Sequence, residues 1–165
     1  MNEAHLHLMI NHIPLVGIGF VTVLLVVSLI MKNSTLINVS LIFVILVALW
    51  AIPAYLTGEP AEEIVEDLPG ISERMIEEHE EAAETAFIFV EAVGGLALLT
   101  LIVRRFSAKS GMVLTLLTLV GIITGGGLIA WTANLGGKIN HPEIRSDTAP
   151  IRSPAGESHR ERDND

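Results

Sequence analysis

Four long apolar runs constrain this chain more than any other feature. They cover about residues 8–31, 36–56, 82–103 and 111–134. Each approaches the roughly 20 apolar residues that cross a ~30 Å hydrocarbon core. Backbone in lipid must satisfy its own hydrogen bonds, so runs of this length are expected to be helices. Half of the residues are apolar and the mean hydropathy is +0.55, a composition typical of a membrane protein.

The connections between the runs predict an all-α, up-down four-helix bundle over residues 1–140. Two connections are short turns, which place consecutive helices antiparallel. The third, residues 57–81, is a long acidic loop in which we expect an amphipathic helix beginning at Pro60. Pro69-Gly70 ends that helix, and a second helix restarting at Ser72 is expected to run into the third span. The polar residues 141–165 are expected to form a disordered tail.

The distribution of basic residues predicts the orientation in the membrane. The two short turns carry Lys32, Arg104, Arg105 and Lys109 and no acids. Basic loops face the cytoplasm, so both termini and the acidic loop of this multi-pass protein are expected outside. The residues before the first run include Glu3 but no Lys or Arg. A signal peptide begins with positive charge, so we expect this run to remain as a span.

Charge and cysteine content exclude several functions. Eleven of the nineteen acidic residues fall between Glu59 and Glu84, where the only base is Arg74. No basic patch with interleaved aromatic residues exists, so no nucleic-acid partner is expected. The chain has no cysteine, which excludes disulfides, thiolate-bound zinc, iron–sulfur clusters and covalently attached c-type haem.

Histidines supply the main chemical signal. Five of the six map to the outer end under this topology, and His159 lies in the tail. The five are His5, His7, His12, His79 and His141. A single histidine at a membrane boundary is usually interfacial. Imidazole is nevertheless costly in hydrocarbon and is the commonest metal ligand, so the shared location favours a bound metal or cofactor.

His12 and His79 are the candidate axial ligands of a b-type haem, because the first and third helices of such a bundle are diagonal neighbours. His7 and His141 are secondary candidates. A continuous first helix would turn His7 about 140° away from His12, whereas a helix starting near His12, before Pro14, would leave His7 in a loop. Both arrangements remain open. Small residues such as Gly121 and Gly125 indicate close helix packing, or room for a flat cofactor.

Two other functions use the same residues. A copper or zinc site could form from His7, His12, His79 and His141, with the acidic loop collecting cations for binding or transport. The other function is that of a structural subunit that binds no cofactor and whose histidines lie at the membrane interface.

Glu91 lies inside the third apolar run, where a carboxylate is expensive and usually faces the bundle interior. Glu84 shares its helix face at a spacing of seven residues. A proton relay or a polar network beside a cofactor is one interpretation of the pair. A protonated Glu91 bonded to Thr124 or Asn11 is the structural alternative.

The two ends of the bundle resemble a known family. His7-Leu-Met-Ile-Asn-His12-Ile-Pro14 and Leu135-Gly136-Gly137-Lys138-Ile139-Asn140-His141 resemble the opening and closing segments of a bacterial family of four-span membrane proteins of unknown function. His79 occupies a matching position at the head of the third helix. The resemblance covers about the first 145 residues. It departs at Leu8, where the family often has proline, and at the spacing of His141 from the glycines.

The resemblance implies periplasmic-side histidines and b-type haem or related redox work. Its members stand near cytochrome c-type and other respiratory components, which implies such subunits as partners. We therefore expect an electron carrier or accessory subunit of a redox complex in the lipid bilayer, without a substrate of its own. A homo-oligomer is compatible with this pattern.

Overall fold

The computed structural model describes residues 2–66, 68–69, 71–141 and 145. The described residues contain six helices and no strand, so the predicted all-α fold class is confirmed. In chain order the helices are α1 (Glu3–Ile10), α2 (His12–Ile30), α3 (Ser34–Leu56), α4 (Gly58–Val65), α5 (Glu73–Arg104) and α6 (Ala108–Asn140).

Side-chain caps fix where three of the long helices begin. Asn33, Ser72 and Ser107 stand immediately before α3, α5 and α6. Each side-chain oxygen accepts a hydrogen bond from the backbone N–H three residues later. These bonds satisfy donors that the first turn of a helix leaves without partners. Each of these three helices therefore begins at a defined residue.

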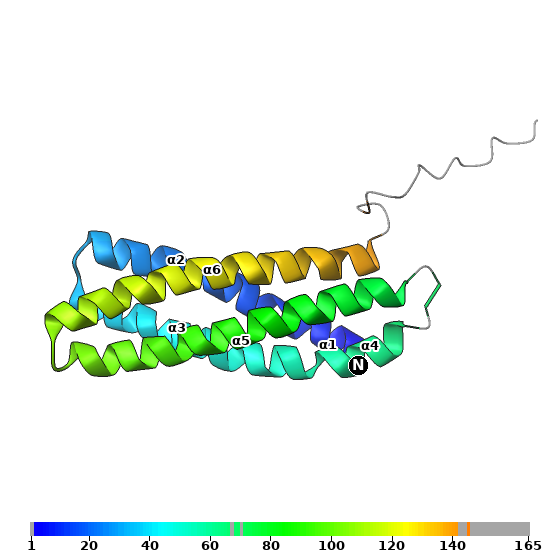
Figure 1. Ribbon diagram of the computed structural model, residues 1–165, viewed down its shortest axis with the longest axis horizontal. Helices are drawn as coiled ribbons and strands as arrows, with labels where there is room; N and C mark the ends of the chain where they lie inside the picture. Colours follow the sequence, from blue (N-terminus) through cyan, green and yellow to red (C-terminus); the bar gives the residue numbers. More distant parts are fainter. Residues whose placement is uncertain (1, 67, 70, 142–144, 146–165) are drawn as a thin grey trace, which may run out of the picture.

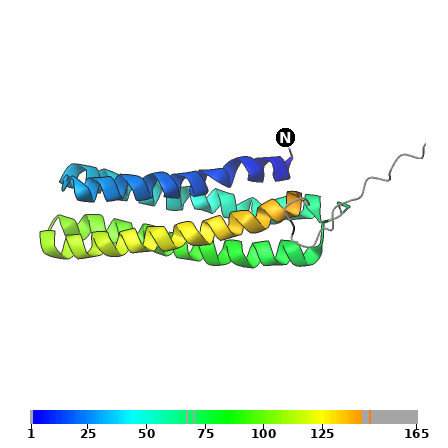
Figure 2. The same ribbon diagram turned by 90° about the horizontal axis from the view of Figure 1, so that it is seen from above.

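The four long helices form an up-down bundle (Figure 1). The packed pairs are α2–α3, α3–α5, α5–α6 and α6–α2, so α2 and α5 are diagonal, as predicted. The short helix α1 packs against α4 at the end where the chain starts and where α6 finishes (Figure 2). One end of the bundle thus gathers parts of α1, α4, α5 and α6, which lie far apart in the sequence.

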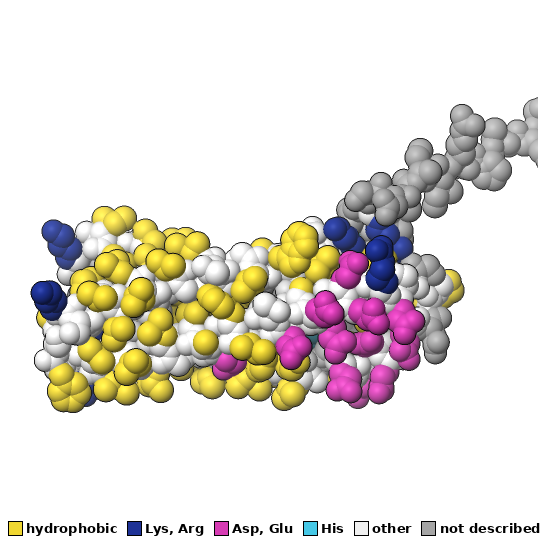
Figure 3. Space-filling view, in the orientation of Figure 1, with side chains coloured by type: hydrophobic (Ala, Val, Ile, Leu, Met, Phe, Trp, Pro, Cys, Tyr) yellow, Lys and Arg dark blue, Asp and Glu magenta, His cyan; other side chains and the backbone are white. Residues whose placement is uncertain are grey.

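The two ends of the bundle differ in charge. We call the end with α1, α4, the start of α5 and the close of α6 the acidic end. The opposite end, with the α2–α3 and α5–α6 turns, is the basic end. Figure 3 shows acidic side chains gathered over the first of these and absent from the second. The basic end carries Lys32, Arg104, Arg105 and Lys109.

The four long helices are long and apolar enough to cross a membrane. Many large apolar side chains point outward, among them Val16, Ile30 and Val120, which are 67%, 75% and 62% exposed. A soluble monomer rarely exposes apolar surface so widely, whereas lipid-facing helices do. These features are those of a multi-pass membrane bundle, with an apolar belt between its charged ends (Figure 3).

Small residues bring the helices close together. A side chain at Gly94 of α5 would place its Cβ 2.5 Å from the Ala48 Cβ of α3. At Gly121 of α6 it would meet the Val93 Cγ2 of α5 at 2.8 Å. Such close approach favours dispersion contacts between helices in lipid. Gly121 thus serves helix packing, the first of its two predicted roles.

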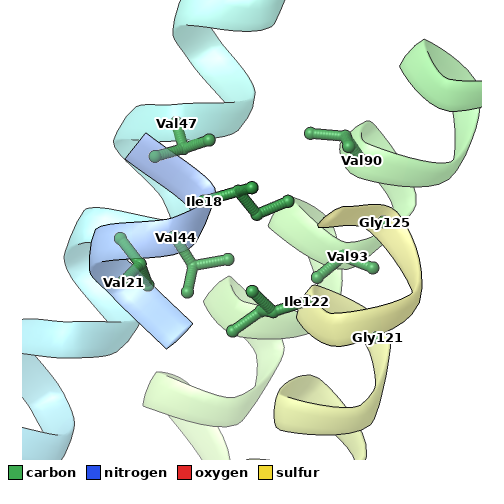
Figure 4. A pocket seen from close by; sticks show the side chains of 9 residues that line it. All are labelled: Ile18, Val21, Val44, Val47, Val90, Val93, Gly121, Ile122 and Gly125. Carbon is green, nitrogen blue, oxygen red and sulfur yellow. The ribbon is translucent and has the colours of Figure 1, made fainter. Parts of the chain in front are cut away.

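The bundle core is tightly filled by apolar side chains. Figure 4 shows valines and isoleucines from all four long helices pointing toward one another around a small cavity beside Gly121 and Gly125. Its volume is about 10 Å³, close to the minimum for one water molecule. Nearer the basic end, two hydroxyl pairs join neighbouring helices. Ser28 and Ser40 link α2 to α3, and Thr100 and Thr118 link α5 to α6, each at 3.1 Å.

The structure refines three sequence boundaries. The first apolar segment is divided at Asn11 into α1 and α2. The predicted loop helix is present as α4, and α5 begins at Glu73 and runs without a break into the third apolar segment. The fourth apolar run, about residues 111–134, lies within α6, which continues to Asn140. Gly136 lies in this last part of the helix, where the His79 ring packs on it. The predicted tail lies outside the described residues, apart from His141 and Arg145.

Candidate metal centre

His79 of α5 is held against α6 at the acidic end. Its ring Nδ1 lies 3.0 Å from the carbonyl oxygen of Thr132. The ring packs on Gly136, where an added Cβ would approach the imidazole Cε1 to 2.9 Å. Thr132 and Gly136 are one turn apart on α6, so the carbonyl and the missing side chain face the same imidazole. The ring is partly buried and fixed in orientation.

This contact determines where the proton of His79 resides. A carbonyl oxygen only accepts hydrogen bonds, so Nδ1 must carry the hydrogen. Burial lowers the pKa of His79, and the Thr132 carbonyl opposes that shift only in part. His79 precedes the predicted span at residues 82–103, and its ring is neutral at pH 7. The Nε2 atom therefore presents a lone pair, the form of imidazole that binds metals.

His7 is held in a similar way at the acidic end. Its Nδ1 lies 3.1 Å from Thr57 Oγ1, between α3 and α4. The Thr57 hydroxyl donates toward the carbonyls of Pro53 and Ala54, at 2.9 and 3.1 Å. With its one hydrogen engaged, this hydroxyl accepts from the His7 Nδ1–H. The Nε2 atom of His7 is thus also left with a lone pair.

His7 and His79 are neighbours. Burial is the largest cause of the lowered pKa of His7, and repulsion from His79 lowers it further, while the Ala54 carbonyl opposes the shift. Such repulsion requires that the two rings lie within electrostatic range. His7 precedes the predicted span at residues 8–31. The structure therefore places His7 and His79 within electrostatic range of one another, each with its Nδ1 bonded to an oxygen of another element.

The other candidate histidines among the described residues are exposed. His12 is exposed, and its Nδ1 lies 2.7 Å from the carbonyl oxygen of Leu8 on the preceding turn. No hydrogen bond or charge contact joins His12 to His79 within the described residues. His5 is exposed on α1, and His141 is exposed where α6 ends. The structure thus places His7 beside His79, and His12 outside the pair.

A third protein ligand is absent from the described part of the chain. No group of three or more His, Cys, Asp or Glu side chains there could hold a metal ion. Structural zinc sites take four protein ligands and catalytic ones take three. Any metal at His7 and His79 would complete its coordination with water, another small ligand or a cofactor.

The acidic end carries closely spaced carboxylates. Glu62 of α4 has a raised pKa, first because of burial and then because Glu80, Glu66, Glu59 and Glu77 repel its charge. Carboxylates of α4 therefore lie close to those of α5. A concentration of one sign of charge raises the local concentration of the opposite ions. This end of the bundle attracts cations.

The two acids of the predicted polar network lie in different surroundings. Glu84 is exposed on α5. Glu91 is partly buried, and its Oε1 has no hydrogen-bond partner among the described residues. The hydroxyl of Thr124 donates instead to the Val120 carbonyl of its own helix. The structural alternative for Glu91, a bond to Thr124, is therefore not formed.

The bundle core does not fit a macrocycle. The space predicted around Gly121 and Gly125 is a cavity of only about 10 Å³, enough for one water at most. A porphyrin between α2 and α5 would have to displace the packed valines and isoleucines of Figure 4. Among the described residues, the imidazoles lie toward the acidic end, outside this core.

Sequence reasoning missed the residues that support the pair, Thr57, Thr132 and Gly136. Glycines within a long helix are the one available signal, since they mark close approach by another group. Comparison with known protein families, curated proteins and solved structures found no match. The family resemblance of the two ends stays a prediction.

Proposed function

We propose that this membrane protein binds a transition-metal ion through His7 and His79 at its acidic end. The observation that carries the proposal is the shared state of the two imidazoles. Each ring gives its Nδ1–H to an oxygen of another helix, and each pKa is lowered. Metal-bound histidines are held in the same way, with the second nitrogen hydrogen-bonded and the first free to coordinate.

Copper or zinc suits such a site better than a hard cation, because imidazole is a borderline ligand. In the proposal, the carboxylates of α4 and α5 gather cations from solution and the two imidazoles retain them. The acidic end faces the periplasm and both termini lie there, since Lys32, Arg104, Arg105 and Lys109 mark the other end as cytoplasmic. The membrane is the inner membrane of a bacterium.

Metal analysis of the protein purified from cells supplied with copper or zinc tests this function. One metal per chain is expected in the wild type. His7→Ala and His79→Ala should each lower the affinity at least about tenfold. His12→Ala is the matched control and should retain the metal. A protein whose metal content is indifferent to His7 and His79 would contradict the proposal and favour the cofactor-free structural subunit.

A second candidate is a b-type haem protein that transfers electrons, alone or as a subunit beside cytochrome c-type partners. One observation favours it: the described site offers two imidazoles and no third ligand, and a haem iron needs no more than two axial ligands. The macrocycle would lie at the acidic end, because the core has no space for it. A Soret band that shifts on dithionite reduction, and disappears in His79→Ala, would select this candidate over a metal ion.

A further inference from the structure

The basic end contains a cleft that the metal site does not involve. It is lined by Ser34, Asn38 and Ile42 of α3 and by Leu101, Arg104 and Arg105 at the end of α5. Its volume is about 440 Å³. The lining combines polar and cationic side chains with the apolar Ile42 and Leu101. Ile42 is 48% exposed on the outer surface of the bundle.

Arg104 is rigidly positioned beside this cleft. Its Nε donates to Asn38 Oδ1 at 2.8 Å, its Nη1 to Thr115 Oγ1 at 3.3 Å and its Nη2 to Ser34 Oγ at 3.2 Å. Close packing of Gly111 on the Arg104 side chain brings α6 against it. Three helices therefore hold one guanidinium in a single orientation.

All three acceptors are neutral, so the charge of Arg104 is not balanced. A guanidinium carries five N–H donors, and these bonds occupy one on each nitrogen. One donor remains on Nη1 and one on Nη2. Guanidinium N–H donors match phosphate oxygens in charge and geometry, which is why arginine often recognises phosphates.

The rest of the basic end offers no counter-charge either. The side chain of Arg105 makes no hydrogen bond or ion pair with any described residue. Between residues 4 and 58 the sequence has no acid, and from residue 92 to residue 140 it again has none. Figure 3 shows basic and no acidic side chains there. Within the described part of the chain, the basic end therefore has cations that an anion from outside could pair with.

We propose that the cleft binds the phosphodiester headgroup of an anionic phospholipid. The remaining Arg104 donors take two phosphate oxygens, Arg105 adds a second charge, and an acyl chain leaves along Ile42 and Leu101. The position of the cleft favours a lipid over a free anion, because the cleft lies at a membrane boundary and its lining combines cationic with apolar side chains. Basic pockets between spans on the cytoplasmic side bind lipid headgroups in this manner.

Lipid affinity measured by native mass spectrometry of the full chain tests the site, with phosphatidylglycerol and phosphatidylcholine offered at equal concentration. The wild type should prefer phosphatidylglycerol. Arg105→Gln, which breaks no internal contact, should weaken phosphatidylglycerol binding about fivefold. Arg104→Lys keeps the charge but loses the paired donors, and should weaken it as well. Lys109→Gln alters a charge of the same end outside the cleft and should bind as the wild type does.

Three results would overturn the site. Equal binding of both lipids by the wild type would remove the role of the charged headgroup. Unchanged phosphatidylglycerol binding in both Arg105→Gln and Arg104→Lys would place the lipid elsewhere. Displacement of the lipid by millimolar inorganic phosphate would show a site for free anions. Neither the metal content nor the visible spectrum of these variants should change, so this proposal stands or fails apart from the metal centre.

Discussion

His79 on α5 and Thr132 on α6 are joined by a bond of 3.0 Å from the imidazole Nδ1 to the carbonyl oxygen. This contact links two helices at the acidic end and leaves the Nε2 lone pair of His79 available. It depends on Gly136, the next residue on the same face of α6, because a larger side chain there would occupy the place of the ring.

Gly136→Ala should therefore weaken metal binding without unfolding the bundle. The new methyl group would stand 2.9 Å from Cε1 of His79 and push the ring away from Thr132. Loss of a group that orients a metal ligand typically lowers affinity about 10- to 100-fold. Gly127→Ala on the same helix is the control, since nothing lies within 4 Å of its Cβ. Equal metal affinities of the two variants would show that Gly136 does not support the site.

Gly94→Val should destabilise the bundle. Its Cβ would lie 2.5 Å from the Cβ of Ala48, so α3 and α5 would have to separate. Overpacking of this kind costs about 1–3 kcal/mol. Gly95→Val is the neighbouring control and meets nothing within 4 Å. Unfolding in mixed micelles compares them, and a Gly95→Val protein as unstable as Gly94→Val would contradict the packing described for α3 and α5.

The buried hydroxyls of Ser28 and Ser40 should show a small but measurable coupling. They lie 3.1 Å apart between α2 and α3, and both are completely buried. Interhelical hydrogen bonds in membranes contribute about 0.6 kcal/mol on average. A double-mutant cycle with Ser28→Ala and Ser40→Ala should return an energy of that order. Additive single effects would mean that each hydroxyl gives its one hydrogen to the carbonyl of its own helix, Leu24 or Leu36, and not to the other serine.

Acid should destabilise the protein through the pair proposed to bind the metal. Burial lowers the pKa of both His7 and His79, so each ring binds a proton more readily in the unfolded chain. Their contribution to stability is complete above the ordinary histidine pKa of 6.5 and is lost as the pH falls below it. Micellar unfolding at pH 7.5 and 5.5 should show this loss, and the double variant His7→Gln and His79→Gln should reduce it. An unchanged pH dependence in that variant would assign the effect to other groups.

Much of the fold could be predicted from local sequence because the constraints are local. The length of each apolar run sets the spans, and Pro69-Gly70 and Ser72 mark the gap before α5. The diagonal relation of α2 and α5 follows from short turns and chain order. These features require no knowledge of how one helix is rotated against another.

The pairing of the histidines could not be predicted, because it depends on rotation. Whether His7 or His12 faces the bundle is decided by how α1 and α2 meet at Asn11 and by the packing of α1 on α4. Neither appears as a pattern in the sequence. The role of Gly136 was hidden for a similar reason, since a glycine in a helix indicates close approach without naming the group that approaches.

The central claim is that His7 and His79 hold one metal between them. X-ray absorption of the copper-loaded protein tests it most directly, because the outer-shell scattering of imidazole gives the number of histidines on the metal. We predict two imidazoles in the wild type and in His12→Ala, and one in His7→Ala or in His79→Ala. A metal that keeps both imidazoles when His7 or His79 is removed, or loses one when His12 is removed, would contradict the account.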